Sequence, residues 1–104
     1  MSTKQDKLQT LLEKDLKKLG YINSNNIKDL NKVYYELFLK EDEKSVIVYV
    51  VNAHNNYFPR ETGMYKEVCK NLIDIGYEIR MNYPCFITIE YRRFYGVSAE
   101  EEYY

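Results

Sequence analysis

The first part of the chain repeats its apolar residues with the period of an α-helix. One stripe of this period runs from Thr3 to Leu19 and holds five leucines, at Leu8, Leu11, Leu12, Leu16 and Leu19. Thr3 followed by Asp6 predicts a capping box at the start, and Gly20 stands where a left-handed residue ends a helix. Lysines and acidic residues share the rest of the segment, which predicts a solvated outer face.

The same period returns in the second half of the chain. Its apolar stripe consists of Met64, Val68, Leu72 and Ile75, and Gly76 follows directly. We therefore predict a second helix that begins near Pro59 or Thr62 and ends at Ile75. The segment before it, from Asn52 to Arg60, is rich in Asn and predicts a loop.

Four further stretches have the patterns of β-strands and fall into two predicted hairpins. In the first, Val33 to Leu39 alternates, and Ser45 to Val51 is apolar on both faces, as in a central strand. In the second, Tyr77 to Met81 and Cys85 to Tyr95 flank a turn that contains Pro84. The order of elements predicts an α+β fold: a two-layer sandwich of αββαββ order with a mainly antiparallel four-stranded sheet.

The alternation in the strands also predicts an aromatic face of the sheet. If both helices cover one face, the other displays aromatic side chains among charges of both signs: Tyr34, Glu36, Phe38, Phe86, Thr88, Glu90, Arg92 and Phe94. Aromatic residues and Arg are common anchors of protein-binding surfaces. The alternative is that one helix or the tail covers this face, so that the aromatic residues belong to the core.

Length, charge and hydropathy narrow the class of protein. The 104 residues suit a single domain over 1–104, with 96–104 as a solvated acidic and aromatic tail. Basic residues number 15 and acidic residues 16, so the net charge of −1 does not favour binding to phosphate. The longest apolar run, Val46 to Val51, is too short to span a membrane, and no secretory signal is recognisable. With only two cysteines, we predict a cytoplasmic protein that binds no membrane.

No motif in the sequence carries catalytic or ligand-binding chemistry. His54 is the only histidine and falls in the Asn-rich loop, while Cys69 and Cys85 fall at apolar positions that predict buried, inert thiols. Neither the spacing of zinc or calcium ligands nor a glycine-rich phosphate loop occurs in the sequence. The sequence therefore predicts a protein that is not an enzyme and that holds no cofactor or metal.

Nucleic-acid binding is the main alternative. Arg92 and Arg93 lie among Tyr91, Phe94 and Tyr95, a combination in which aromatic rings can stack on bases. An RNA-recognition domain, however, has the order βαββαβ and a glycine-containing aromatic motif that this sequence lacks. The balanced charge also disfavours phosphate contacts, so we expect protein binding instead.

The candidate partner-binding residues are aromatic or arginine side chains on the predicted open face, in the loop and in the tail. They are Tyr34, Phe38, Tyr57, Phe58, Arg60, Phe86, Arg92, Phe94, Tyr103 and Tyr104. Tyrosine alone supplies 12 of the 104 residues, and the abundance of Asn, Lys, Ile and Tyr is typical of AT-rich coding.

A small single domain without catalytic motifs, with this length, coding bias and aromatic content, resembles the proteins with which phages of low-GC Gram-positive bacteria block a host protein. It resembles in particular the staphylococcal phage inhibitors of the replicative helicase loader. The resemblance implies binding to the AAA+ ATPase domain of the loader, which blocks loader self-assembly and so host DNA replication. An anti-CRISPR or other anti-defence inhibitor, a nucleic-acid-binding accessory protein and a structural subunit of an assembly remain alternatives.

Overall fold

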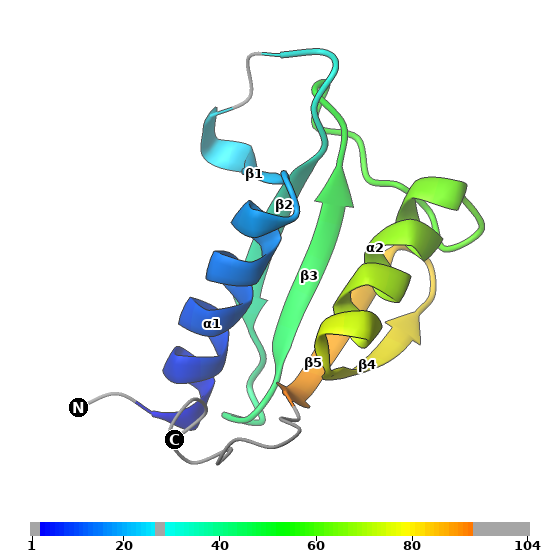
Figure 1. The fold of residues 1–104 in the computed structure, drawn as a ribbon. Helices are drawn as coiled ribbons and strands as arrows, with labels where there is room; N and C mark the ends of the chain where they lie inside the picture. Colours follow the sequence, from blue (N-terminus) through cyan, green and yellow to red (C-terminus); the bar gives the residue numbers. More distant parts are fainter. Residues whose placement is uncertain (1–2, 27–28, 93–104) are drawn as a thin grey trace.

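The computed structural model, which describes residues 3–26 and 29–92, has an α+β fold in which two helices pack on a five-stranded mixed sheet (Figure 1). Both helices lie on the same face of the sheet, and both contribute side chains to one hydrophobic core. In chain order the elements are α1 (Lys4–Lys18), β1 (Ile22–Asn23), the 3₁₀ helix η1 (Ser24–Asn26), β2 (Tyr34–Leu39), β3 (Val46–Val51), α2 (Gly63–Ile75), β4 (Tyr77–Asn82) and β5 (Phe86–Arg92).

The sheet joins two hairpins through its middle strand. Its order is β1-β2-β3-β5-β4, in which β1 runs parallel to β2 and the other neighbours are antiparallel. The position of β3 between β2 and β5 confirms the prediction of a central strand. Val48 pairs with Leu37 on one side and with Ile87 on the other, so one row of apolar residues crosses three strands beneath the helices.

The ends of both helices follow the signals in the sequence. The backbone N–H of Asp6 donates to Oγ1 of Thr3 at 3.0 Å, and the Thr3 N–H donates to the Asp6 carboxylate at 3.2 Å, which completes the capping box of α1. The hydroxyl oxygen of Thr62 caps α2 by accepting from the Tyr65 N–H at 3.4 Å. Gly76 ends α2 with φ of 116°, a left-handed conformation that glycine adopts without a steric penalty.

The hydrophobic core lies between the two helices and the sheet. Among the described residues, the buried side chains that form it are Leu8, Leu12, Leu16, Tyr35, Val46, Val48, Val50, Tyr65, Val68, Cys69, Leu72, Tyr77, Ile87 and Ile89. The tyrosine hydroxyls of this cluster have polar partners: that of Tyr65, for example, donates to the carbonyl oxygen of Phe86 at 2.8 Å. Burial raises the pKa of Tyr65 to about 12, so this hydroxyl remains a hydrogen-bond donor throughout the ordinary pH range.

The expected four-stranded sheet and αββαββ order are wrong in detail, because a fifth strand, β1, lies between α1 and β2, where no strand was predicted. Strand β1 has only two residues, and its hydrogen bond from the Ile22 N–H to the Val33 carbonyl oxygen measures 3.1 Å. Two residues are too few for an alternating pattern, so the signal that identifies longer strands is absent here. The side chain of Asn23 then accepts a hydrogen bond from the Asn25 N–H at 3.0 Å and turns the chain into η1.

The predicted place of Arg92 on the open face is also wrong. The pairing of β4 with β5 shifts between Glu78 and Ile79, which pair with Tyr91 and Ile89, so that Glu90 is an extra residue in β5. An extra residue in one strand reverses the alternation beyond it, and Arg92 therefore lies on the face that the helices cover.

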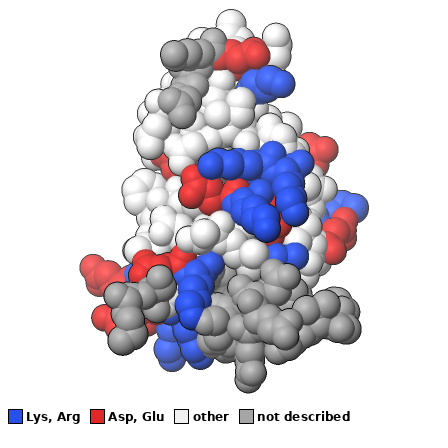
Figure 2. Space-filling view, turned by 60° about the vertical axis from the view of Figure 1, so that its left-hand side comes forward, with Lys and Arg blue, Asp and Glu red and all other residues white. Residues whose placement is uncertain are grey.

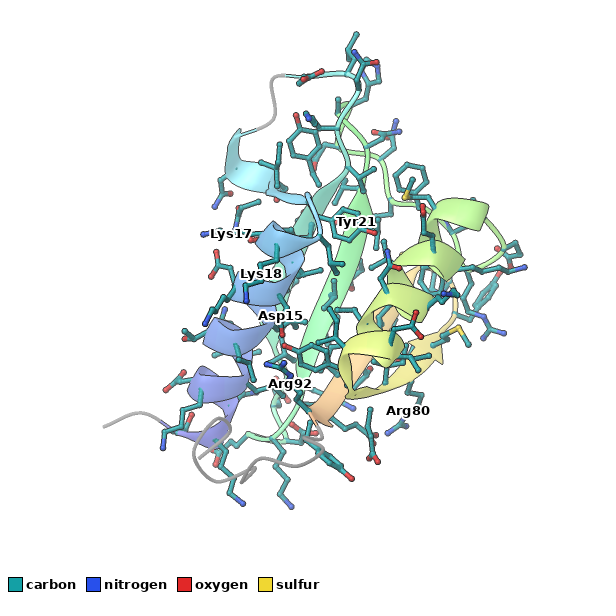
Figure 3. The ribbon with its side chains drawn as sticks, in the orientation of Figure 1. Asp15, Lys17, Lys18, Tyr21, Arg80 and Arg92 are labelled. Atoms are coloured by element: carbon teal, nitrogen blue, oxygen red, sulfur yellow. The ribbon has the colours of Figure 1, made fainter. Side chains whose placement is uncertain are left out.

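Arg92 belongs to a polar cluster between α1 and the sheet (Figure 3). One guanidinium nitrogen, Nη1, lies 3.3 Å from Oδ2 of Asp15, whose side chain is 7% exposed. The hydroxyl of Tyr77 donates to the same oxygen at 2.6 Å. The ion pair between Arg92 and Asp15 thus compensates the charge of the buried carboxylate and links α1 to β5, the last described strand.

Candidate functional site: the aromatic face of the sheet

Four aromatic rings form a continuous cluster on the sheet face opposite the helices. The rings of Phe38 and Tyr49 meet edge to face, with centroids 5.5 Å apart. The centroid of Tyr49 also lies 4.8 Å from that of Tyr57 and 5.7 Å from that of Phe86. These distances are in the favourable range for aromatic pairs. We call Phe38, Tyr49, Tyr57 and Phe86 the aromatic face.

The strand register explains why these rings meet. Tyr49 pairs with Glu36 on β2 and with Phe86 on β5, so Tyr49 and Phe86 point to the same side of neighbouring strands. Phe38 follows Glu36 at the next position of that face, and Tyr57 comes from the loop, where it forms an isolated bridge with Val51. The three strands and the loop thus place one ring each around the centre of the sheet.

The cluster is open to solvent. Phe38 is 50% exposed and Tyr57 is 45% exposed, while Tyr49 and Phe86 are half-buried between them. No helix among residues 3–26 and 29–92 packs on this side of the sheet (Figure 1). The exposed rings are contiguous, and a contiguous apolar patch on a polar surface is characteristic of an interaction site.

Charged groups border the aromatic face. The hydroxyl of Tyr57 lies 3.4 Å from Oε1 of Glu36, and the charge of that carboxylate raises the pKa of Tyr57. Farther along the sheet, Arg80 and Glu90 form an exposed ion pair at 2.7 Å. An apolar centre with charges of both signs at its edge has the composition of a protein-binding patch.

Three of the ten candidate partner-binding residues come together in this cluster: Phe38, Tyr57 and Phe86. Tyr34 points to the same side but is only 1% exposed, and its hydroxyl donates to the carbonyl oxygen of Asp29 and accepts from the Asp29 N–H, both at 2.9 Å. Arg92 lies on the covered face, as described above. The prediction of exposed anchors at these two positions is therefore wrong.

Two further candidates, Phe58 and Arg60, do not join the cluster. Phe58 packs against the hydrophobic core on the side of the helices, and Arg60 is exposed in the loop, where its N–H donates to the carbonyl oxygen of Pro84. Phe94, Tyr103 and Tyr104 lie outside the described residues.

Sequence reasoning missed Tyr49, which contacts the other three rings. Its strand is apolar on both faces, and this pattern hides which residues face the core. The signal that was present is the parity of the strand: Tyr49 falls two residues after Ile47 and two before Val51, in antiphase to Val46, Val48 and Val50 of the core.

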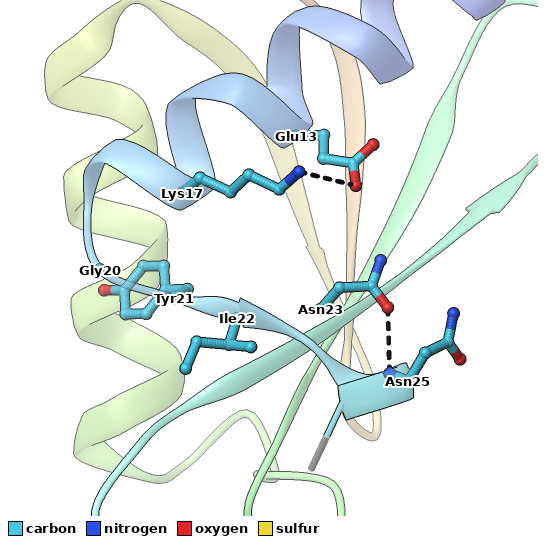
Figure 4. Close-up of a pocket in the computed structure, with 7 residues that line it drawn as sticks. All are labelled: Glu13, Lys17, Gly20, Tyr21, Ile22, Asn23 and Asn25. Carbon is cyan, nitrogen blue, oxygen red and sulfur yellow. Dashed lines mark hydrogen bonds and ion pairs between the residues drawn. The ribbon is translucent and has the colours of Figure 1, made fainter. Parts of the chain in front are cut away.

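A polar groove runs beside β1, on the side of α1. The hollow in Figure 4 has a volume of about 510 Å³ and is lined by Glu13, Lys17, Gly20, Tyr21, Ile22, Asn23 and Asn25. A neighbouring hollow of about 330 Å³, which we call the edge notch, is lined by Gln9, Glu13, Asn23, Ser24, Asn25, Glu36, Leu37 and Phe38. The edge notch therefore reaches from α1 to the rim of the aromatic face.

The residues with nucleophilic or metal-binding side chains are dispersed. Cys69 lies on the buried side of α2, and burial raises the pKa of its thiol to about 11, whereas Cys85 is half-buried and its pKa is also raised by burial. His54 lies in the loop and is exposed. Within the described ranges, no three His, Cys, Asp or Glu side chains are grouped so as to hold a metal ion.

The outer side of α1 carries several lysines. Figure 2 shows Lys and Arg atoms gathered there next to Asp and Glu atoms, so charges of both signs are mixed. Lys17 lies 3.6 Å from Glu13, an exposed pair of i,i+4 spacing. Such mixing lowers the local positive potential that would attract phosphate.

Comparisons with known proteins identify no relative. No protein-family model matches the chain, no curated protein has a matching sequence, and no solved structure matches its fold. In the part of the chain that the structure describes, neither helix is long and apolar enough to cross a membrane.

Proposed function

We propose that this protein binds a bacterial host protein through the aromatic face and inhibits it without catalysing a reaction. The observation that carries the proposal is the contiguous cluster of Phe38, Tyr49, Tyr57 and Phe86 on a sheet face that no described helix covers. The partner that we propose first is the AAA+ helicase loader, because the chain resembles phage inhibitors of that class. Occupying the self-assembly surface of the loader would block host DNA replication.

Aromatic rings on a sheet suit such a role. A β-sheet holds them at fixed spacing, so that little conformational entropy is lost when a partner covers them. Tyr49 and Phe86 are already held by their neighbours, and Phe38 and Tyr57 present half of their surface to solvent. Binding residues with these properties commonly supply most of the affinity of an interface.

An anti-CRISPR or other anti-defence inhibitor would use the same face in the same way, and only the identity of the captured protein separates these functions. A nucleic-acid-binding accessory protein has less support. The guanidinium of Arg92, which the sequence placed beside exposed aromatic rings, pairs with Asp15 instead. In β5, the positive charge of Arg92 therefore does not lie beside the exposed aromatic rings, as base stacking with phosphate contacts would require.

The test is capture of the partner by the full chain and by two matched variants. The double variant Phe38→Ala and Tyr57→Ala removes the exposed half of the aromatic face. The control is Ile73→Ala on α2, because Ile73 and Phe38 are both 50% exposed while Ile73 lies on a different element. We expect wild type and control to bind the purified helicase loader equally in titration calorimetry, and the double variant to lose about tenfold or more in affinity.

Two results would contradict the proposal. The first is that the double variant binds as tightly as wild type, which would move the interface elsewhere. The second is that wild type captures no protein from a lysate of a Gram-positive host, whereas it binds labelled DNA with an affinity that falls steeply with salt. That second result would favour the nucleic-acid-binding alternative.

A further inference from the structure

The outer edge of β2 is covered by another described strand over only part of its length. Strand β1 pairs with Tyr34 and Tyr35 and then ends, whereas β2 continues to Leu39. The Ile22 N–H donates to the carbonyl oxygen of Val33, so the backbone of Val33 faces this edge. Backbone direction alternates along a strand, and therefore the N–H and C=O groups of Leu37 and Leu39 face the same edge.

The other side of the strand agrees with this assignment. The Lys40 N–H donates to the carbonyl oxygen of Ser45 at 3.1 Å, so Lys40 faces β3 and its neighbour Leu39 faces away. Leu37 and Leu39 therefore each direct a backbone N–H and a backbone C=O toward the edge of β2 beyond the point where β1 ends.

The edge notch lies over this part of β2. It exists because the chain turns away at Asn23, whose side chain accepts from the Asn25 N–H and directs η1 outward from the sheet. The notch has room for about 330 Å³ beside the part of this edge that no other described strand covers. An extended segment that enters it would continue the line of β1 along Leu37 and Leu39.

The charge of the notch is negative. Glu13 of α1 lines it from the helix side, Glu36 lines it from the aromatic side, and the other polar lining groups are neutral. Lys17 contacts Glu13 at 3.6 Å but lines the neighbouring hollow rather than the notch (Figure 4). The notch therefore has the charge to bind basic side chains.

The opposite edge of the sheet is built differently. On β4, Glu78 and Arg80 place charges on the outermost strand, a common device against pairing with another chain. Met81 of β4 is also 50% exposed, but it follows Arg80 directly, whereas Phe38 (50% exposed) and Leu39 (45% exposed) are adjacent apolar residues at the end of β2. Apolar side chains beside a free edge favour strand addition there over the β4 edge.

We propose that the edge notch binds an extended segment of the protein partner that carries two adjacent basic residues. The segment adds to the sheet beside Leu37 and Leu39 through backbone hydrogen bonds. Adjacent residues of a strand point to opposite faces, so one basic side chain reaches Glu13 and the other reaches Glu36. This inference rests on the proposed function, since it identifies the part of the partner that lies next to the aromatic face.

The first experiment uses a fluorescein-labelled probe, acetyl-Thr-Val-Lys-Arg-Val-Thr-amide, with the full chain in fluorescence polarisation. The matched control peptide has Glu-Glu in place of Lys-Arg. We expect the basic probe to bind at least about tenfold more tightly than the acidic one, and the double variant Glu13→Gln and Glu36→Gln to remove that preference. Equal binding of the two peptides, or no binding of either, would overturn the proposal.

The second experiment tests the backbone. Two methylated versions of the probe are made, each N-methylated at alternate residues, so that each version lacks the N–H groups along one edge of the peptide. Only the version that lacks the N–H groups facing β2 should bind more weakly, by about tenfold. The protein variant Leu39→Pro removes one edge-facing N–H, and Leu39→Ala is its matched control. If both methylated versions bind like the parent probe, the segment is not an added strand.

The two proposals can fail separately. If Leu39→Pro captures the partner as wild type does while Phe38→Ala with Tyr57→Ala does not, the notch proposal is overturned and the proposed function stands. If the basic probe binds with the expected backbone dependence but no variant or wild type captures a host protein, the proposed function is contradicted and the peptide chemistry of the notch stands.

Discussion

The two faces of the sheet use similar strands for different purposes. On the covered face, Val46, Val48 and Val50 point from β3 into the core and are almost fully buried. On the other face, the same strand presents Ile47 and Tyr49, which are half-buried. The covered face packs against buried side chains of both helices, most of them aliphatic, whereas the other face carries a cluster of aromatic rings that contact one another. The first arrangement stabilises the fold, and the second leaves apolar surface for a partner.

Tyrosine shows the difference most clearly. On the covered side, the hydroxyls of Tyr65 and Tyr77 each have a partner, the carbonyl oxygen of Phe86 and the carboxylate of Asp15. On the other side, Tyr49 and Tyr57 are held by ring contacts at the surface. The abundance of tyrosine in the composition therefore combines two roles, of which only one needs a buried hydroxyl partner.

The largest effect should come from removing a core side chain of the covered face. Leu72 on α2 is 0% exposed, and we expect Leu72→Ala to lower the free energy of unfolding by about 4 kcal/mol, through lost burial and the cavity left behind. Phe38→Ala on the aromatic face should cost less than about 1 kcal/mol, because half of that ring is already in water. Urea denaturation followed by circular dichroism measures both.

If the two variants lose similar free energy of unfolding, the distinction between a stabilising covered face and an open aromatic face is wrong. Equal losses would mean that the aromatic face is part of the core in solution, covered by a segment of the chain or by a second molecule. Sedimentation of wild type over a range of concentrations then distinguishes these two coverings.

A smaller effect is expected from the buried ion pair that joins α1 to the covered face. Asp15→Asn removes the buried negative charge that Nη1 of Arg92 and the hydroxyl of Tyr77 both contact, which should cost about 3 kcal/mol. The control is Asp74→Asn, whose side chain is 59% exposed and pairs with Lys70 on the surface of α2. Its removal should cost less than about 0.5 kcal/mol. If both variants have the same stability, the Asp15 pair contributes no more than a surface pair.

Much of the fold was predictable because short sequence patterns determine where its helices and longer strands form. The leucine stripe, the capping box of Thr3 and Asp6 and the glycine after each helix specify α1 and α2 directly. The alternation in β2 specifies which of its residues meet the helices. Strand β1 and the shifted register of β5 were not predictable, because a two-residue strand has no period and a bulge leaves no mark in the hydrophobic pattern.

The candidate site was predictable to a similar degree. Phe38 and Phe86 lie on the expected face because their strands alternate up to those positions. Arg92 lies beyond the bulge and was placed on the wrong face for that reason alone. Tyr34 was placed on the correct side, but the loop that covers it depends on a contact with Asp29 that no periodicity encodes.

The smallest effect concerns the turn that sets the register on which both faces depend. A slip of one residue between β2 and β3 would exchange the core residues with the aromatic face. Asp42 holds the turn, because its carboxylate accepts from the N–H groups of Lys44 at 2.8 Å and Ser45 at 2.9 Å. These bonds lower the pKa of Asp42 from 3.8 to about 2.

The sign of the pH dependence follows from this lowered pKa. Folding favours the charged carboxylate, so its contribution is complete at pH values above 3.8 and is lost as the pH falls through about 2. Because Asp42 is exposed to solvent, we expect the contribution to be only about 1 kcal/mol. In urea denaturation near neutral pH, the free energy of unfolding of the wild type should exceed that of Asp42→Asn by this amount. The difference should disappear at the lowest pH at which the protein is still folded. A difference that stays constant over this range would show that the amide and the carboxylate differ in shape or solvation rather than in charge.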